Sequence, residues 1–393
     1  MRLRRTGAAR RTRRPILLHG TTIGMSANRL LRGQLSYMRE QGWDVHLATT
    51  PGPDLELARD REGFTAHPLR MSRDIDPLQD LLSLARWLRL LAALRPAVTN
   101  MSTPKAALLG SIAAFVTRVP KRVYVVRGLR LEGTEGGKRK LLALLERLTI
   151  LLSTDVVAVS HSLAATLREH RLVGAKREIH VLGAGSSNGV DAEAVRAAAS
   201  SEDAELLRKE LGVDGRVVVG YLGRISADKG LDTLADAISR PPLADAPGWV
   251  LLCVGGVEDH AVLDILRRNG DRVVHVDHTS EPWKHLAAMD VLCLPTRREG
   301  FPNVVLEAGA LGIPTVSTDA TGAVDAVRDG ETGLTVAVDD AAGLSSALSR
   351  LVQDGELRSR MGSTASRWVR EDFRPERIWA ELDALYRGAP DEE

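Results

Sequence analysis

The chain has 393 residues, of which 44% are apolar and 26% are charged, a composition typical of a soluble globular protein and not of a disordered one. This length exceeds what one hydrophobic core usually serves, so we expect two domains. The formal net charge of +2 is unevenly divided, because residues 1–183 carry +16 and residues 184–393 carry −14. The asymmetry favours an anionic partner for the first half, either a membrane surface or a phosphorylated or nucleic-acid ligand.

The first 14 residues form a basic tail with seven arginines. A strand-length apolar stretch follows it in place of a signal-peptide core, and no apolar run approaches the about 20 residues of a membrane-spanning helix. We therefore expect a cytoplasmic protein. Cys253 and Cys293 each lie inside an apolar run, which favours buried thiols over a disulfide or a metal site.

Short apolar runs alternate with amphipathic stretches along the chain, which is the rhythm of βαβ units and parallel sheets. In the first half the expected strands are residues 16–19, 43–48, 97–101, 122–126, 155–159 and 178–182, and the expected helices are 28–41, 77–94, 104–117, 138–152 and 162–171. In the second half the expected strands are 216–222, 249–254, 272–276, 290–294, 314–317 and 334–336, with helices at 231–239, 259–269, 281–288, 302–311 and 375–386. Two doubly wound domains follow from this pattern.

Two motifs are similar to ligand-binding motifs, but we interpret both as structural. Residues 183–188, GAGSSN, nearly match a dinucleotide-binding fingerprint, but turn-forming residues follow where a helix would have to begin, so we interpret the segment as a hinge. Asp74 and Asp76 have the spacing of a metal-binding D-x-D. Because Pro77 and a long helix follow, we favour Asp76 as a helix cap.

A candidate anion site follows the predicted strand 216–222. Gly223 and Arg224 begin a loop that ends in Lys229 and Gly230, immediately before a helix. Backbone amides and two cations at the carboxyl end of a strand suit a diphosphate. The alternative is a pair of solvated loop charges.

Two carboxylates follow the predicted strand 290–294. Glu299 lies in the loop and Glu307 lies eight residues later in a helix, so their side chains cannot share one exposed tip and would reach different parts of an extended ligand. Glu307 has apolar neighbours in sequence, where a carboxylate needs a hydrogen-bond partner such as a ribose diol. The alternative is a glutamate on the solvent-facing side of the helix.

Together the Arg224-to-Lys229-Gly230 spacing and the segment EGFPNVVLE resemble family 4 of the retaining glycosyltransferases, which have the GT-B fold. The segments RGQLSYMREQGWDVHLATTPG, STPKAALLGSIAAFVTRVPKRVYVVRGLR and GSSNGVD are similar to its bacterial capsular and lipid-linked-saccharide branch. The resemblance covers residues 15–390. It implies two Rossmann-like domains facing each other across a cleft, at 15–185 (acceptor side) and 186–374 (nucleotide-sugar side), with a helix at 375–393 crossing back to the first domain.

The resemblance also implies a UDP-sugar donor and a hexosyl transfer that retains anomeric configuration without an enzyme nucleophile. Arg224, Lys229 and Glu299 would be the catalytic residues, with the two cations on the diphosphate and Glu299 on donor-sugar hydroxyls. The implied donor-binding residues are Gly223, Arg224, Lys229, Glu299, Gly300, Phe301, Asn303 and Glu307, the last on the ribose. The resemblance implies neither a cofactor nor a metal ion.

The acceptor side departs from the wider family. Candidate acceptor residues are Gly24, Asn100, Lys105 and Arg127; Asn100 lies where many members have histidine, and Arg127-Gly128 replaces a common HG dipeptide. We expect Arg127 to meet an anionic acceptor. The basic, leucine-rich stretches 81–94 and 138–147 suit peripheral contact with the inner face of an anionic membrane, although they also suit packing on a sheet. The expected acceptor is then a polyprenyl-diphosphate-linked saccharide of envelope polysaccharide assembly.

Alternative functions stay open. A transferase acting on a soluble secondary metabolite, or a UDP-sugar epimerase on the same fold, would share the donor motifs. A two-domain binding protein would not need the pairs of cations and carboxylates. A nucleic-acid-binding protein would explain the basic half, but the low aromatic content of 4% and the spread of charge over a whole domain argue against nucleic acid as a partner.

Overall fold

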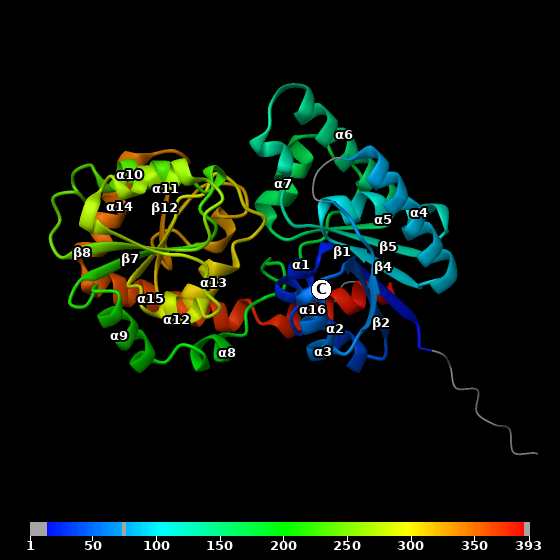
Figure 1. The fold of residues 1–393 in the computed structure, drawn as a ribbon, viewed down its shortest axis with the longest axis horizontal. Helices are drawn as coiled ribbons and strands as arrows, with labels where there is room; N and C mark the ends of the chain where they lie inside the picture. Colours follow the sequence, from blue (N-terminus) through cyan, green and yellow to red (C-terminus); the bar gives the residue numbers. More distant parts are fainter. Residues whose placement is uncertain (1–13, 73–75, 389–393) are drawn as a thin grey trace, which may run out of the picture. The chain divides into compact units, whose positions relative to one another are not determined.

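Two parallel β-sheets organise the chain in the computed structural model, which describes residues 14–72 and 76–388 (Figure 1). Within these residues, each sheet has six strands. The first sheet has the strand order β3-β2-β1-β4-β5-β6 and the second has the order β12-β11-β10-β7-β8-β9. Helices cover both sheets, so the prediction of two Rossmann-like domains is confirmed.

The elements follow the chain with helix and strand in alternation over most of its length. The first are β1 (Ile16–Ile23), α1 (Gly24–Leu30), α2 (Gln34–Glu40), β2 (Asp44–Thr50), α3 (Pro53–Glu62), β3 (Thr65–Pro68), α4 (Pro77–Leu94), β4 (Val98–Met101), α5 (Pro104–Val116), β5 (Lys121–Val126), η1 (Arg130–Gly133), α6 (Gly136–Leu152), β6 (Asp155–Ala158) and α7 (His161–Glu169). The next are α8 (Ala192–Ala197), α9 (Ser201–Glu210), β7 (Val217–Leu222), η2 (Ala227–Lys229), α10 (Leu231–Ile238), β8 (Trp249–Val254), α11 (His260–Arg267), η3 (Gly270–Arg272) and β9 (Val273–Val276). The last are α12 (Pro282–Ala287), β10 (Val291–Leu294), α13 (Asn303–Ala310), β11 (Thr315–Thr318), η4 (Val324–Ala326), β12 (Gly333–Val336), α14 (Ala341–Gln353), α15 (Gly355–Asp372) and α16 (Pro375–Arg387).

Contacts within the chain define two compact units. One ends at Tyr124 and includes Leu152–Thr154; the other comprises Val125–Leu151 and the chain from Asp155 onward. The domain bounds expected from the resemblance, and the return of the last helix to the first domain, stay predictions. Within the second unit, α16 contacts the segment 183–190, because Trp379 donates a hydrogen bond of 2.7 Å to Asn188 and Glu381 accepts one of 2.6 Å from the Gly183 amide.

The central strands β7, β8 and β10 of the second sheet are largely apolar because helices cover both faces of the sheet. Figure 1 shows α10, α11 and α14 on one side of this sheet, and α9, α12 and α15 on the other. On β8, all six side chains are buried, Cys253 among them. Cys293 on β10 is also buried, so the prediction of two buried free thiols is confirmed.

Helix α4 begins where the capping signals predict. Asp76 accepts a hydrogen bond of 3.1 Å from the Gln79 amide, and Pro77 occupies the first helical position. The cap interpretation of Asp76 is therefore confirmed. Asp74 and most of the basic tail lie outside the described residues. Within the ranges that are described, no group of three or more His, Cys, Asp or Glu side chains is arranged to hold a metal ion.

Two predicted elements are wrong. The single helix expected over residues 28–41 is broken into α1 and α2 at Gly33, which has φ of 78°. Glu62, from the end of α3, accepts hydrogen bonds from the amides of Gly33 (2.9 Å) and Ser36 (3.2 Å) and so caps α2 from outside. The strand expected over residues 178–182 is only an isolated bridge between Val157 and His180.

The segment 183–190 has the turn geometry that its composition predicts. Gly183, Gly185, Ser186 and Gly189 all have positive φ, and the following helix begins only at Ala192. Asp191 caps that helix by accepting a hydrogen bond of 2.9 Å from Ala194. The geometry therefore differs from that of a dinucleotide-binding turn, in which a helix begins at once. Motion at this segment stays a prediction.

Candidate functional site

The candidate donor residues lie where the order of the second sheet reverses. The chain passes from β7 to β8 and β9 on one side, then returns to β10, which pairs with β7 on its other side through Val219 and Val291. The loops after β7 and β10 therefore leave the same carboxyl edge in opposite directions. In open α/β sheets, ligands bind at such a switch point.

Lys229 and Glu299 meet at this edge, although 70 positions separate them in the sequence. The Nζ atom of Lys229 donates to Oε1 of Glu299 over 2.6 Å, and the two side chains are 13% and 19% exposed. A carboxylate and an ammonium this far from bulk water hold each other in place more firmly than a surface pair does. Two of the three predicted catalytic residues thus form one cluster.

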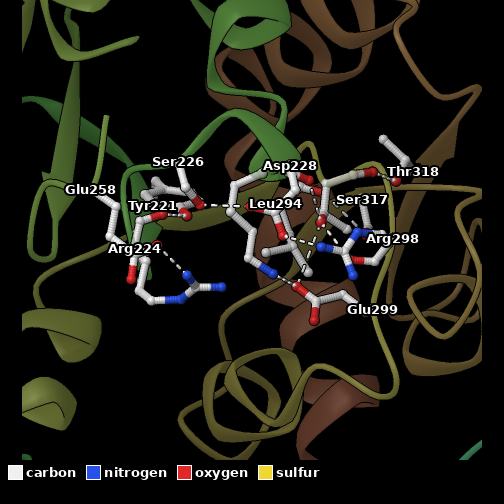
Figure 2. A network of polar contacts seen from close by, with 12 residues as sticks. Tyr221, Arg224, Ser226, Asp228, Glu258, Leu294, Arg298, Glu299, Ser317 and Thr318 are labelled. Carbon is white, nitrogen blue, oxygen red and sulfur yellow. Dashed lines mark hydrogen bonds and ion pairs between the residues drawn. The ribbon is translucent and has the colours of Figure 1, made fainter. Parts of the chain in front are cut away.

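Arg224, the third, is not part of that contact. Its guanidinium pairs with Glu258, which follows β8, and its side chain is 55% exposed. The backbone of Arg224 is held more firmly than its side chain, because the buried hydroxyl of Tyr221 donates a hydrogen bond of 2.7 Å to the Arg224 carbonyl. Figure 2 shows Arg224 beside Glu258 at one end of the polar network and Glu299 well apart from this pair. An exposed pair of this kind contributes little to stability, so Arg224 is available to exchange Glu258 for an anionic ligand.

Asp228 adds a negative charge to the loop. Its carboxylate accepts a hydrogen bond of 2.7 Å from the Ser226 hydroxyl and forms an ion pair of 3.3 Å with Arg298. Burial raises the pKa of Asp228, but the Ser226 hydrogen bond and the charges of Lys229 and Arg298 outweigh burial, so the pKa lies below its usual value. The loop therefore presents its two cations with an ionised carboxylate between them.

The segment that follows Glu299 is tightly packed. A Cβ on Gly300 would lie 2.2 Å from the carbonyl oxygen of Arg127, so only glycine fits there. The Phe301 ring is buried and lies 5.6 Å from the ring of Phe373. The side-chain carbonyl of Asn303 accepts a hydrogen bond of 3.1 Å from the Ser186 hydroxyl. Gly300 and Phe301 thus have packing roles in this segment, and their contact with a donor stays a prediction.

Helix α13 starts directly after this segment. Pro302 precedes its first residue and no side chain caps its amides, so its first turn is suited to a phosphate oxygen. Glu307 lies four residues into the helix and is half-buried between two buried residues, Leu306 and Ala308. The burial agrees with the apolar setting expected for Glu307. The ribose contact stays a prediction.

Gly223 joins the β7 loop to the β8 loop. Its amide donates a hydrogen bond of 2.9 Å to the Val254 carbonyl. A Cβ on Gly255 would lie 1.8 Å from the Gly223 carbonyl oxygen, so the two loops approach closely. Two residues on, Ile225 bridges to Val257. This side of the anion loop is therefore attached to β8.

Three acceptor candidates belong to the first unit and have structural partners there. A Cβ on Gly24 would lie 3.0 Å from the Leu55 amide, so α1 and α3 pack closely at this glycine. Lys105 pairs with Asp80 over 2.7 Å. Asn100 is buried on β4 and pairs in register with His19 of β1.

Arg127 belongs to the second unit. Its Nη1 donates 3.1 Å to the Ser187 carbonyl, whereas its buried Nε has no hydrogen-bond partner among the described residues. Burial lowers the pKa of Arg127 to about 10. Contact of this guanidinium with an anionic acceptor stays a prediction.

Several residues of the network are absent from the sequence prediction. They are Tyr221, Asp228, Glu258, Arg297 and Arg298. The adjacent arginines Arg297 and Arg298 can be seen in the sequence just before Glu299, but the sequence does not show their carboxylate partners, which lie tens of residues away.

Comparison with known proteins gives matches over both halves of the chain. Residues 25–185 match the model of the "Glycosyl transferase 4-like domain" and residues 216–354 match that of "Glycosyl transferases group 1". The chain is 35% identical over 374 residues to the capsular polysaccharide biosynthesis glycosyltransferase CapM of Staphylococcus aureus, covering 94% of this chain and 96% of CapM.

Two further proteins are similar over part of the sequence or in fold. An N,N'-diacetylbacillosaminyl-diphospho-undecaprenol α-1,3-N-acetylgalactosaminyltransferase of Campylobacter jejuni is 32% identical over 42% of this chain and 43% of its own. Anabaena Alr3699/HepE, whose crystal structure contains UDP-glucose, has a TM-score of 0.78 at 19% identity, covering 95% of this chain and 100% of that one. The chain belongs to the family 4 glycosyltransferases, whose fold is GT-B.

Proposed function

We propose that the protein is a retaining glycosyltransferase that moves a hexose from a UDP-sugar to a polyprenyl-diphosphate-linked saccharide during bacterial envelope polysaccharide assembly. The observation that carries the donor side is the meeting of Lys229 and Glu299 at the switch point, with Arg224 exposed on the same loop. A nucleoside diphosphate needs cations there, and a sugar needs a carboxylate that accepts from its hydroxyls. The presence of UDP-glucose in the HepE structure supports a uridine nucleotide.

In the proposed reaction, the bond between the anomeric carbon and the diphosphate oxygen breaks. The acceptor hydroxyl bonds to the same face of that carbon, and its proton passes to the departing diphosphate. Lys229 and Arg224 stabilise the charge that builds on the diphosphate, a contribution whose loss typically lowers the rate about 10²–10³-fold. Glu299 orients the sugar hydroxyls and Glu307 holds the ribose. No metal ion or cofactor takes part in this scheme.

The names of two relatives support the acceptor. CapM is named for capsular polysaccharide biosynthesis and the Campylobacter enzyme for a diphospho-undecaprenol acceptor. The guanidinium of Arg127, whose buried Nε has no hydrogen-bond partner among the described residues, suits an anionic group of such an acceptor. Gly24, Asn100 and Lys105 are proposed to shape the acceptor side through the packing described above.

Helix α6 supports contact with an anionic membrane on the cytoplasmic side. Its exposed residues include the basic residues Lys138–Lys140 and the leucines Leu141, Leu144 and Leu151. Each basic side chain near an anionic surface contributes on the order of 1 kcal/mol, so such a helix can hold the protein there reversibly. Among the residues described, no helix combines the length and apolar character that crossing a bilayer requires.

The donor side is tested by a metal-free screen of nucleotide sugars, in which release of nucleoside diphosphate is measured. We expect slow hydrolysis of a UDP-sugar by the wild-type protein and its loss in Lys229→Ala. Lys209→Ala is the matched control, because Lys209 is an exposed lysine of the same unit. Full activity of Lys229→Ala would refute the site assignment, and an isomerised nucleotide sugar formed without acceptor would favour an epimerase.

The acceptor side is tested separately with lipid-linked and soluble acceptors, with and without anionic liposomes at physiological salt. We expect transfer to the lipid-linked acceptor and co-sedimentation with the liposomes. Exclusive use of a soluble acceptor, together with no liposome binding, would refute the lipid-linked acceptor and favour a soluble metabolite.

A further inference from the structure

Arg297, two residues before Glu299, is bonded in three directions. Its Nε pairs with Asp339 over 2.8 Å, its Nη2 pairs with Asp232 over 2.7 Å, and its Nη1 donates 2.5 Å to the Ala227 carbonyl. Its backbone amide donates 3.1 Å to the Asp228 carbonyl. The side chain is 30% exposed, and its carboxylate partners Asp232 and Asp339 are 43% and 53% exposed, so the cluster is partly open to solvent.

These partners come from three segments that meet around the anion loop. Ala227 and Asp228 belong to η2, the short turn that ends with Lys229. Asp232 lies in the first turn of α10. Asp339 lies between β12 and α14, and its carboxylate also accepts a hydrogen bond of 3.1 Å from the Thr233 hydroxyl. Arg297 therefore connects the loop that carries Lys229 to two neighbouring segments and to the end of β10.

The charges of this cluster are mutually dependent. Burial raises the pKa of Asp232, but the hydrogen bond and charge of Arg297 outweigh it, so that pKa lies below its usual value. The hydrogen bond that Arg297 donates to Asp232 in turn raises the pKa of Arg297. Removing the guanidinium would leave two carboxylates and the Ala227 carbonyl without this donor.

We propose that Arg297 is a positioning residue that holds Lys229 at the distance from Glu299 required to bind the donor diphosphate. The inference rests on the proposed function. The turn η2 has no side-chain cap of its own, and its far side is attached through Ile225 to Val257, in the segment after β8. On the side of β10, Arg297 bonds directly to the two residues that precede Lys229.

The residue type supports positioning over direct binding. An arginine presents donors along several directions in one plane, and here each direction already has a partner; a lysine ammonium in its place could not reach all three. Arg224, by contrast, is 55% exposed and has one carboxylate partner. Arg297 thus acts on the ligand through Lys229.

The test uses the full-length protein with UDP and uridine as probes, by ligand-observed NMR, together with donor hydrolysis and thermal unfolding. For Arg297→Ala we expect UDP affinity to fall roughly tenfold or more while uridine affinity is unchanged, and kcat to fall on the order of 10²-fold, as for a misplaced catalytic group. Arg297→Lys should not restore either value. The matched control is Arg240→Ala, which breaks a pair with Asp236 on the far end of α10 and should alter neither.

A double-mutant cycle separates positioning from direct contact. If Arg297 acts through Lys229, adding Arg297→Ala to Lys229→Ala should lower UDP affinity no further. An equal loss in both backgrounds would overturn the inference, as would a lowered unfolding temperature with UDP affinity unchanged. Should Arg297→Ala fail to fold, Asp339→Asn removes one carboxylate at a left-handed backbone position that asparagine tolerates, and should still weaken UDP binding.

The wild-type protein provides the remaining distinction. A wild-type chain that does not bind UDP would overturn the proposed donor and the inference with it. If the wild-type protein binds UDP and Arg297→Ala, Arg297→Lys and Asp339→Asn bind it with the same affinity, the positioning role of Arg297 is overturned while the proposed donor stands.

Discussion

Replacing Gly230 by alanine tests how the anion loop is positioned. Gly230 follows Lys229 and precedes α10, and its φ is +65°. A Cβ at this position would lie 1.9 Å from the carbonyl oxygen of Pro295, in the loop after β10. The side chain would therefore push the loop that carries Lys229 away from the segment that carries Glu299.

The expected effect has two parts. The left-handed conformation costs an alanine about 1–2 kcal/mol. The contact is shorter than an ordinary carbon-to-oxygen approach of about 3.3 Å by more than 1 Å, and its partner is backbone, so the loop must move by on the order of 1 Å. A displacement of this size can lower the rate about 10²-fold. Gly230→Ala should therefore lose both stability and donor turnover.

Gly212→Ala is the matched control, because Gly212 has the same φ of +65° and a Cβ placed there would have no described residue within 4 Å beyond its chain neighbours. Urea unfolding and donor hydrolysis should be measured for both variants and the wild-type protein. We expect Gly212→Ala to lose about 1–2 kcal/mol of unfolding free energy with activity intact. Equal losses of stability and activity in the two variants would refute the idea that the close approach to Pro295 positions Lys229.

Three further predictions concern thiols, metals and the ribose. Burial raises the pKa of Cys253 to about 12 and raises that of Cys293 as well, so neither thiol should react with a disulfide reagent at pH 8 until the protein unfolds; fast labelling of the native protein would contradict this. Donor turnover should be unchanged by EDTA, and a loss that Mg²⁺ restores would argue for a metal-dependent reaction. Glu307→Gln should raise KM for the donor about tenfold with little change in kcat, as expected for a lost charged hydrogen bond, whereas the exposed-site control Glu205→Gln should change neither.

Much of the fold can be predicted because its signals are local. The bounds of α4 follow from the cap at Asp76 with Pro77, and those of β8 follow from one uninterrupted apolar run. The break between α1 and α2 could not be predicted in this way, because the carboxylate that caps α2 is that of Glu62, 29 positions after Gly33. The same limit explains the false strand at 178–182, where apolar spacing is present but only a single bridge forms.

The residues alone predict the alternation of strands and helices, the candidate anion loop between Gly223 and Gly230, and the candidate pair Glu299 and Glu307 after the next strand of the site. These depend on residue type and on spacing over a few turns of chain. The three-dimensional structure was needed to see that Lys229 pairs with Glu299 while Arg224 pairs with Glu258, and that Arg297 links η2 to Asp232 and Asp339. The physical reason is that strand order in the sheet, with β10 beside β7, brings together side chains that are tens of residues apart, and no local pattern encodes which of several cations each carboxylate will meet.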